Sequence, residues 1–99
     1  MNNYNIEHTK GEKDQSDQLT FSGELSFSFI QSIKDETDGI LNINQAYRIL
    51  VKEVDILDLS FIQLLLSIKQ THTNSTIELQ VNEEISDLIK ISGFQNFLV

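Results

Sequence analysis

A serine that follows an aspartate by two residues is the strongest chemical signal in this sequence. The pair is Asp58 and Ser60, at the start of an apolar run. An aspartate immediately before a helix caps it, because its carboxylate accepts hydrogen bonds from backbone N–H groups left free in the first turn. Ser60 is then the second helical residue, beside free N–H donors and the positive end of the helix dipole. Such a hydroxyl is suited to carry a phosphate or to contact one.

The residues that follow predict a largely buried helix with a narrow polar strip. At about 100° per residue, the polar strip contains Ser60, Gln63, Ser67 and Gln70. The apolar residues on the rest of the circumference are Leu59, Phe61, Ile62, Leu65 and Leu66. Leu64 borders the strip, and an apolar residue beside a polar strip is typical of a contact surface. Single exposed apolar residues are also normal on protein surfaces, so both interpretations of Leu64 stay open.

This helix needs a strand before it to hold its first turn in place. Residues 47–51 are dense in apolar and branched side chains, as in a central strand covered on both sides. Residues 52–55 are mostly charged and are interpreted as the turn that leads to the capped helix.

The rest of the chain predicts further strands and helices in alternation. Apolar residues alternate over 4–8, 19–25 and 77–81, which predicts strands, with a bulge or a close backbone approach at Gly23. Helical spacing predicts a helix over 30–40, capped by Ser26 or Ser28 and weakened or ended by Gly39. A last helix is capped by Asn82 and ended by Gly93, with an inner stripe that runs from Ile85 to Ile91 and apolar residues after it that pack back on the body.

These elements predict one α/β domain over residues 1–99. We expect a mixed sheet of four to five strands, about three main helices and crossover connections. The length of 99 residues is enough for one modest core.

Composition narrows the class of partner and the compartment. The net charge is −8, and the seven basic residues are scattered, so direct binding to nucleic acid or to an anionic membrane is disfavoured. An acidic surface could instead steer the domain toward a basic patch on another protein, or it could simply keep the domain soluble. The sequence has no apolar run near the ~18 residues that cross a membrane, and its start does not resemble a secretory signal. We therefore expect a cytoplasmic protein, and the absence of cysteine fits a reducing compartment.

We find no pattern that predicts an enzyme, a metal site or a cofactor. His8 and His72 lie in different regions, and neither has a partner at metal-ligand spacing. Glu83, Glu84 and Asp87 are better explained as a solvated helix start than as an acid/base set, because nothing apolar nearby would raise a carboxylate pKa. Glycine-rich phosphate loops and nucleophile elbows are absent from the sequence.

Residues 19–25, 49–55, 57–62 and 82–94 form four segments that together resemble the STAS family, which includes bacterial anti-sigma-factor antagonists and cytoplasmic domains of sulphate transporters. Residues 19–25, LTFSGEL, look like the family's "L-x-G-E-L-D" strand, and residues 49–55 look like its central strand. Residues 82–94 look like its closing helix. The most specific match is LDLSFI at 57–62, where the antagonists typically read D-S-S-G-L. Ser60 falls on the serine that a partner kinase phosphorylates, while Leu59 replaces the first serine and Phe61 replaces the glycine.

The resemblance implies a binding module that works without catalysis. As an antagonist, it would bind an anti-sigma factor or a kinase-like regulator through the start of the Ser60 helix and be switched by phosphorylation of Ser60. The implied partner-binding residues are Asp58, Leu59, Ser60, Phe61, Gln63, Leu64 and Ser67.

Three other interpretations stay open. The domain could be a constitutive binding subunit of a lipid transporter or a chemotaxis assembly, with Phe61 and Leu64 as permanent anchors. Binding of a small ligand or a nucleotide has only fold analogy behind it. Ser60 could also be an ordinary helix-start serine without a role in binding.

Overall fold

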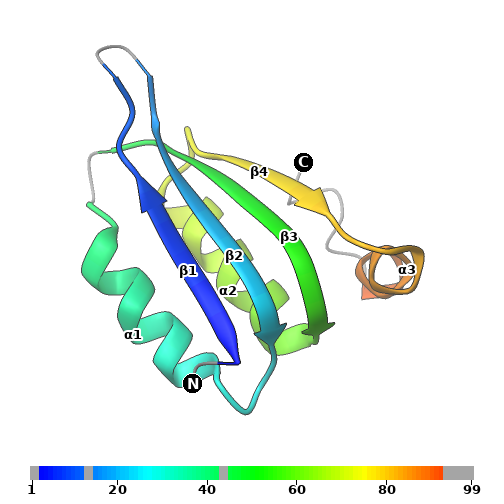
Figure 1. The fold of residues 1–99 in the computed structure, drawn as a ribbon. Coiled ribbons are helices and arrows are strands. Elements are labelled where there is room, and N and C mark those ends of the chain that lie inside the picture. Colours follow the sequence, from blue (N-terminus) through cyan, green and yellow to red (C-terminus); the bar gives the residue numbers. More distant parts are fainter. Residues whose placement is uncertain (1–2, 13–14, 43–44, 93–99) are drawn as a thin grey trace.

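The residues that the structure describes fold as a mixed β-sheet with three helices (Figure 1). The structure is a computed structural model and describes residues 3–12, 15–42 and 45–92. In chain order the elements are β1 (Tyr4–Thr9), β2 (Asp17–Leu25), α1 (Ile30–Ile40), β3 (Tyr47–Leu57), α2 (Leu59–Thr71), β4 (Thr76–Gln80) and α3 (Glu83–Ser92). The expected α/β class is confirmed. The described sheet has four strands, which is the lower end of the four to five expected.

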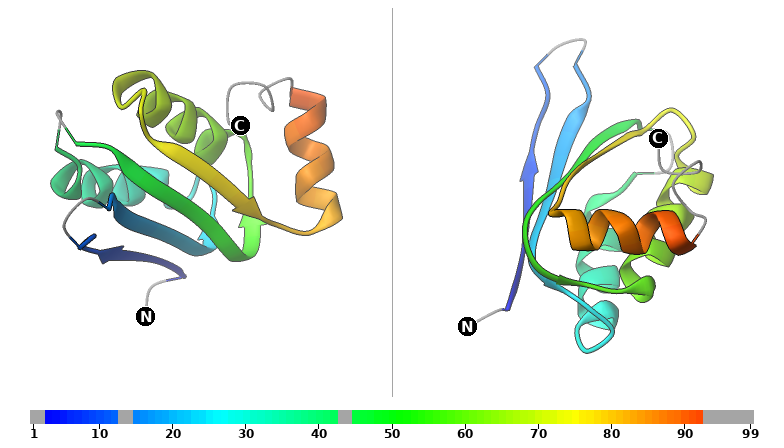
Figure 2. Two further views of the ribbon diagram at one scale, coloured as in Figure 1. Left: turned by 90° about the horizontal axis from the view of Figure 1, so that it is seen from above. Right: turned by 90° about the vertical axis from the view of Figure 1, so that its right-hand side faces the viewer.

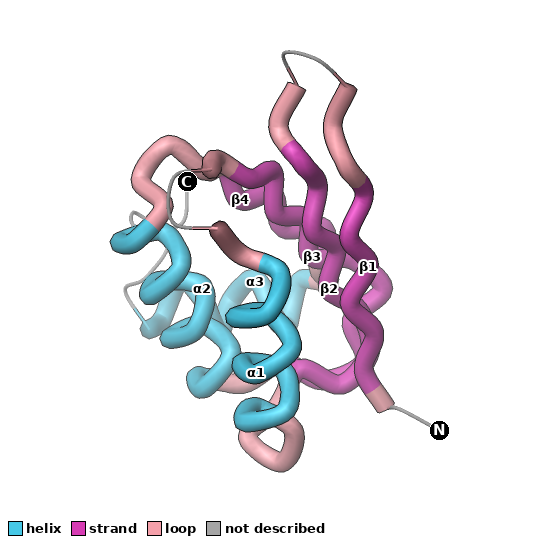
Figure 3. The backbone as a smooth tube through the Cα atoms, turned by 90° about the vertical axis from the view of Figure 1, so that its left-hand side faces the viewer, coloured by secondary structure: helices cyan, strands magenta, loops and turns pink. Residues whose placement is uncertain are grey.

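The four strands lie in the order β1-β2-β3-β4. β1 and β2 form an antiparallel hairpin, whereas β2, β3 and β4 run parallel to one another. Parallel neighbours need crossover connections, and α1 and α2 supply them. Both helices cover the same face of the sheet (Figures 2 and 3). Because α2 connects β3 to β4, the carboxyl end of β3 leads directly into the first turn of α2.

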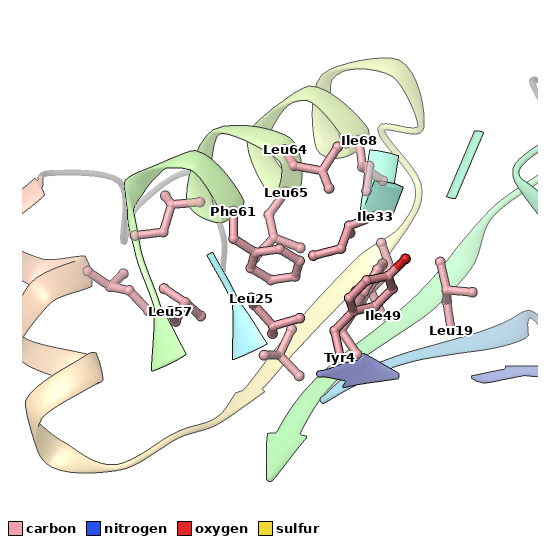
Figure 4. Close-up of a cluster of buried hydrophobic side chains, with 14 of the residues drawn as sticks. Tyr4, Leu19, Leu25, Ile33, Ile49, Leu57, Phe61, Leu64, Leu65 and Ile68 are labelled. Atoms are coloured by element: carbon pink, nitrogen blue, oxygen red, sulfur yellow. The ribbon is translucent and has the colours of Figure 1, made fainter. Parts of the chain in front are cut away.

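The core lies between that face of the sheet and the two crossover helices. Leu19 and Phe21 of β2 and Ile49 and Val51 of β3 are fully buried there. The ring of Phe21 meets the ring of Phe61 from α2 edge to face, with centroids 5.2 Å apart. Figure 4 shows side chains from β2, β3, α1 and α2 converging on this layer. The layer fixes the orientation of α2 and thus of its first turn.

The opposite face of the sheet carries mostly polar side chains. Arg48 of β3 and Glu78 of β4 form an exposed ion pair across neighbouring strands, with nitrogen and oxygen 3.3 Å apart. β4 alternates between exposed and half-buried residues, as the alternation of its sequence predicts. The crossover helices leave this face without cover.

A bulge shifts the register of β2 against β3. Gly23 has a φ of +88°, and a Cβ added there would lie 2.5 Å from the carbonyl oxygen of Asn3. Both the predicted bulge and the predicted close approach at Gly23 are confirmed. Across the bulge Glu53 has a φ of +51°, and β3 continues through it to Leu57. The prediction of a turn over 52–55 is therefore wrong, because the bulge lets a charged segment remain in the strand.

The helix caps agree with expectation in two of three cases. Asp58 caps α2, and the Asn82 side chain accepts a hydrogen bond from the backbone N–H of Ile85 at 2.8 Å. The predicted serine cap of α1 is wrong, since α1 begins after Phe29 with no side-chain hydrogen bond at its cap. Gly39 does not end α1, which continues to Ile40.

The last helix differs from expectation at one residue of its inner stripe. Ile85 and Ile89 are buried as predicted, whereas Ile91 is 85% exposed. The predicted terminator Gly93 and the apolar residues 94–98 lie outside the described residues.

Candidate functional site

The candidate site is built around the Asp58 side chain at the start of α2. Its Oδ1 atom accepts a hydrogen bond from the backbone N–H of Ser60 at 3.0 Å and also one from the Ser60 hydroxyl. The cap predicted from sequence is therefore confirmed, and the hydroxyl of Ser60 is held against the capping carboxylate. Both residues are partly exposed. Ser60 is therefore a partly exposed residue whose hydroxyl lies at the positive end of the helix.

The second oxygen of Asp58 holds a different segment of the chain. Its Oδ2 atom accepts a hydrogen bond from the backbone N–H of Phe27 at 2.8 Å. Phe27 lies in the β2–α1 connection, whose turn is closed by a hydrogen bond from the N–H of Phe29 to the carbonyl of Ser26. One carboxylate thus joins the first turn of α2 to the loop before α1.

These hydrogen bonds favour the charged form of Asp58. Partial burial disfavours the charge and acts to raise its pKa, but the hydrogen bonds from the Ser60 hydroxyl and from backbone N–H groups, including that of Phe27, outweigh burial. The pKa of Asp58 is therefore lowered, and the carboxylate is ionised at neutral pH. A fixed negative charge lies beside the Ser60 hydroxyl.

Two exposed apolar residues adjoin this polar centre, since Phe27 donates its backbone N–H to Asp58 and Leu59 lies between Asp58 and Ser60 in the chain. Phe27 is 77% exposed and Leu59 is 46% exposed, while Gln63 on the next turn is also exposed. We call the set Phe27, Asp58, Leu59, Ser60 and Gln63 the Ser60 surface. Exposed aromatic and aliphatic residues around a polar centre are the composition of many protein contact surfaces.

Two of the expected partner-binding residues are not on this surface. Phe61 is fully buried against Phe21, and Leu64 is only 8% exposed. Their expected role as interface anchors is wrong, because both side chains are already part of the core. Ser67 is exposed two turns further along α2.

The exposed apolar residues of the site were assigned differently from sequence. Leu59, which periodicity places on the buried side of the helix and the resemblance places among the partner-binding residues, is the first residue of α2 and is 46% exposed. Phe27 was missed altogether, since it lies between two serines in a connection with no periodicity. A large aromatic residue flanked by serines just before a helix was the only signal available.

The two histidines take part in contacts far from the Ser60 surface. His8 Nε2 lies 2.9 Å from Asp17 Oδ2 in the β1–β2 hairpin. His72 is buried at the end of α2, where its ring meets Tyr47 edge to face and its Nδ1 lies 3.2 Å from the carbonyl oxygen of Gln45. Within the part of the chain that the structure describes, no three acidic, histidine or cysteine side chains gather as metal ligands would. Glu83 and Glu84 lie in the first turn of α3 as expected.

No family model matches this chain, and no curated protein is significantly similar to it. None of the described helices is long and apolar enough to cross a membrane.

Proposed function

We propose that this protein is a non-enzymatic interaction domain of the STAS type that binds a regulatory protein through the Ser60 surface. The partner class is an anti-sigma factor or a serine-kinase-like regulator, in the cytoplasm, and phosphorylation of Ser60 releases it. The observation that carries this proposal is the Asp58–Ser60 hydrogen bond at a partly exposed helix start. The STAS resemblance of residues 57–62 adds the partner class.

Phosphorylation would change both the charge and the hydrogen bonding of this surface. Phosphoryl transfer from ATP forms a bond between Ser60 Oγ and phosphorus, breaks the Oγ–H bond, and releases ADP and a proton. The product adds about −1.5 to −2 charges and has no hydroxyl hydrogen to donate to Asp58. Two anionic groups then face each other where a hydrogen bond had joined them. The repulsion and the added hydration disfavour a dry contact with a partner.

The switch is tested by partner capture with charge variants. Wild type, Ser60→Ala and Ser60→Asp are compared as baits in lysate of the source cells, and Thr73→Asp is the control. Thr73 is exposed at the opposite end of α2 and adds the same charge away from the Ser60 surface. We expect Ser60→Asp to weaken the captured complex about tenfold or more, and Ser60→Ala and Thr73→Asp to stay within about threefold of wild type.

Equal binding by Ser60→Ala and Ser60→Asp would contradict the switch. Mass measurement of the native protein supplies a second readout, since phosphorylation adds roughly 80 Da to the peptide that contains Ser60. Fragmentation of that peptide must place the phosphate on Ser60 and not on Ser67, which is exposed on the same helix and serves as the internal control.

A constitutive binding subunit of a transporter or chemotaxis assembly is the second candidate. The exposure of Leu59 and Phe27 favours it, because both offer apolar area without any modification. In this case Leu59→Ser and Phe27→Ser would each weaken partner capture, and Ser60→Asp would not. The effect of Ser60→Asp on partner capture therefore separates the two candidates.

A further inference from the structure

The carboxyl-terminal half of β3 has an open edge. β4 pairs with β3 only from Arg48 to Lys52, whereas β3 continues to Leu57 and pairs over this extension with β2 alone. Among the described residues, no strand pairs with the other edge of β3 from Glu53 to Leu57. Alternate residues of a strand direct their N–H and C=O groups to each edge, so this edge presents backbone donors and acceptors.

A groove of about 470 Å³ runs along this open edge. One wall is formed by residues 55–57 of β3, and the other wall by α3 and the residue before it. Figure 1 shows α3 to one side of the sheet, beyond the end of β4 and opposite the lower end of β3. The groove therefore lies where the next strand of the sheet would continue if β4 were longer.

Apolar side chains line the groove. Ile56 is 49% exposed and Ile91 is 85% exposed, and both lie on its walls with the partly buried Leu88. Covering such exposed aliphatic side chains with another chain is favourable, because it removes apolar surface from water. Since Ile56 is on the strand and Ile91 on the helix, a segment between them would contact both.

Carboxylates also line the groove. Asp55 comes from β3, and Glu84 and Asp87 come from α3; all three are exposed. Lys90 is the only basic residue of α3. A segment that fills this groove therefore meets apolar walls and three negative charges.

We propose that this groove binds an extended, basic segment of another protein, which adds to β3 as a further strand. Backbone groups of the segment pair with the open edge, its apolar side chains contact Ile56 and Ile91, and its lysines or arginines meet the carboxylates. This inference does not depend on the Ser60 surface, which lies at the start of α2.

The charge pattern favours a foreign segment over the protein's own. Residues 93–99 of this chain contain three large apolar side chains but no basic residue, so they would leave the carboxylates of the groove without partners. A second copy of this chain carries a net charge of −8 and would bring like charges together. A basic segment that also carries apolar side chains matches both the apolar walls and the carboxylates of the groove.

The test uses full-length, isotope-labelled protein and a blocked peptide of about eight residues that alternates lysine and valine, which is long enough to form a strand. We expect amide NMR shifts to change at residues 55–57 and along α3, and binding to weaken with added salt. Ile91→Ser should weaken binding about tenfold, since it removes an apolar contact, and Asp87→Asn about threefold. Phe27→Ser and Asp38→Asn are the matched controls, with exposed side chains outside the groove, and should leave binding unchanged.

Two further peptides separate strand addition from charge attraction alone. A glutamate–valine peptide should not bind, and a lysine–valine peptide with N-methylated backbone amides should bind at least about tenfold more weakly, because it cannot donate to the strand edge. Equal binding of the methylated peptide, shifts that map elsewhere, or no binding would overturn the proposal. Contacts between Phe97 and Ile91 in the free protein, or dimerisation abolished by Ile91→Ser, would overturn it in favour of the protein's own tail or a second copy.

Discussion

The Asp58 carboxylate accepts a hydrogen bond at 2.8 Å from the backbone N–H of Phe27, which lies 31 residues earlier in the chain. The same carboxylate caps α2 through Ser60. A single side chain therefore fixes two segments that meet at the candidate site. The position of the exposed Phe27 ring depends on a residue in another element.

Asp58→Ala should destabilise the protein by about 1–3 kcal/mol, since it removes a helix cap and the partner of the Phe27 N–H. Urea unfolding followed by circular dichroism measures this loss. Asp55→Asn is the control, because Asp55 is exposed and does not cap a helix, and it should stay within about 0.5 kcal/mol of wild type. A wild-type stability for Asp58→Ala would show that neither hydrogen bond contributes.

The stability difference between wild type and Asp58→Asn should shrink in acid. The folded-state pKa of Asp58 is lowered, so its ionised form contributes stability above the ordinary aspartate pKa of about 3.9, and this contribution is lost as pH falls below that value toward the folded pKa. The variant has no carboxyl to titrate at this position. Urea unfolding at neutral pH and at about pH 3 measures the change.

Asp17→Asn provides a comparison for this pH dependence. Hydrogen bonds from the Gly11 backbone N–H and from His8 lower the pKa of Asp17 in the β1–β2 hairpin. Its stability difference should shrink in the same direction, independently of Asp58. If the difference in unfolding free energy between wild type and Asp58→Asn stays constant with pH, a lowered pKa for Asp58 is contradicted.

Gly23→Ala and Gly39→Ala should have opposite effects on stability. A Cβ at Gly23 would collide with the Asn3 carbonyl and would strain a φ of +88°, which costs about 1–3 kcal/mol. At Gly39, inside α1, no atom lies within 4 Å of an added Cβ, so alanine should stabilise by about 0.5–1 kcal/mol. Thermal unfolding of the two variants measures whether stability falls for Gly23→Ala and rises for Gly39→Ala. A loss of stability in both would contradict the open space around Gly39.

Ser75→Ala should destabilise the protein although it changes only one hydroxyl. The Ser75 hydroxyl is buried and accepts a hydrogen bond from the backbone N–H of Tyr47 at 2.9 Å. Alanine would leave that N–H buried without a partner, at a cost of about 1–3 kcal/mol. The exposed Ser67→Ala is the control, with a change of about 0.5 kcal/mol or less in the same urea titration.

The fold class was predictable because most of its determinants are local. Alternation in 19–25 and 77–81 and the caps Asp58 and Asn82 depend on neighbouring residues, so the sequence contains them directly. Gly23 was readable as a bulge for the same reason, since a glycine inside a strand allows a φ that other residues disfavour. The extension of β3 through Glu53 was not predictable, because it depends on pairing with β2 across the bulge.

The candidate site was predictable at its centre but not at its margin. Asp58 and Ser60 follow from helix-capping chemistry, which acts within three residues. Leu64 was assigned to a possible contact surface because sequence periodicity describes a helix with one buried side. In the fold, α2 packs against the sheet and also lies beside α1, which widens its buried side to include Leu64. Phe27 joins the site only through a long-range hydrogen bond.

The unpaired part of β3 also bears on how this protein avoids aggregation. An exposed strand edge is a template for self-pairing, and proteins commonly protect such edges with charged gatekeeper side chains. Asp55 occupies that position here, and Glu84 and Asp87 add charge of the same sign opposite it. Two identical molecules that approach edge to edge bring these like charges together and repel each other. The acidic residues beside the open edge therefore oppose self-pairing of β3 into fibrils.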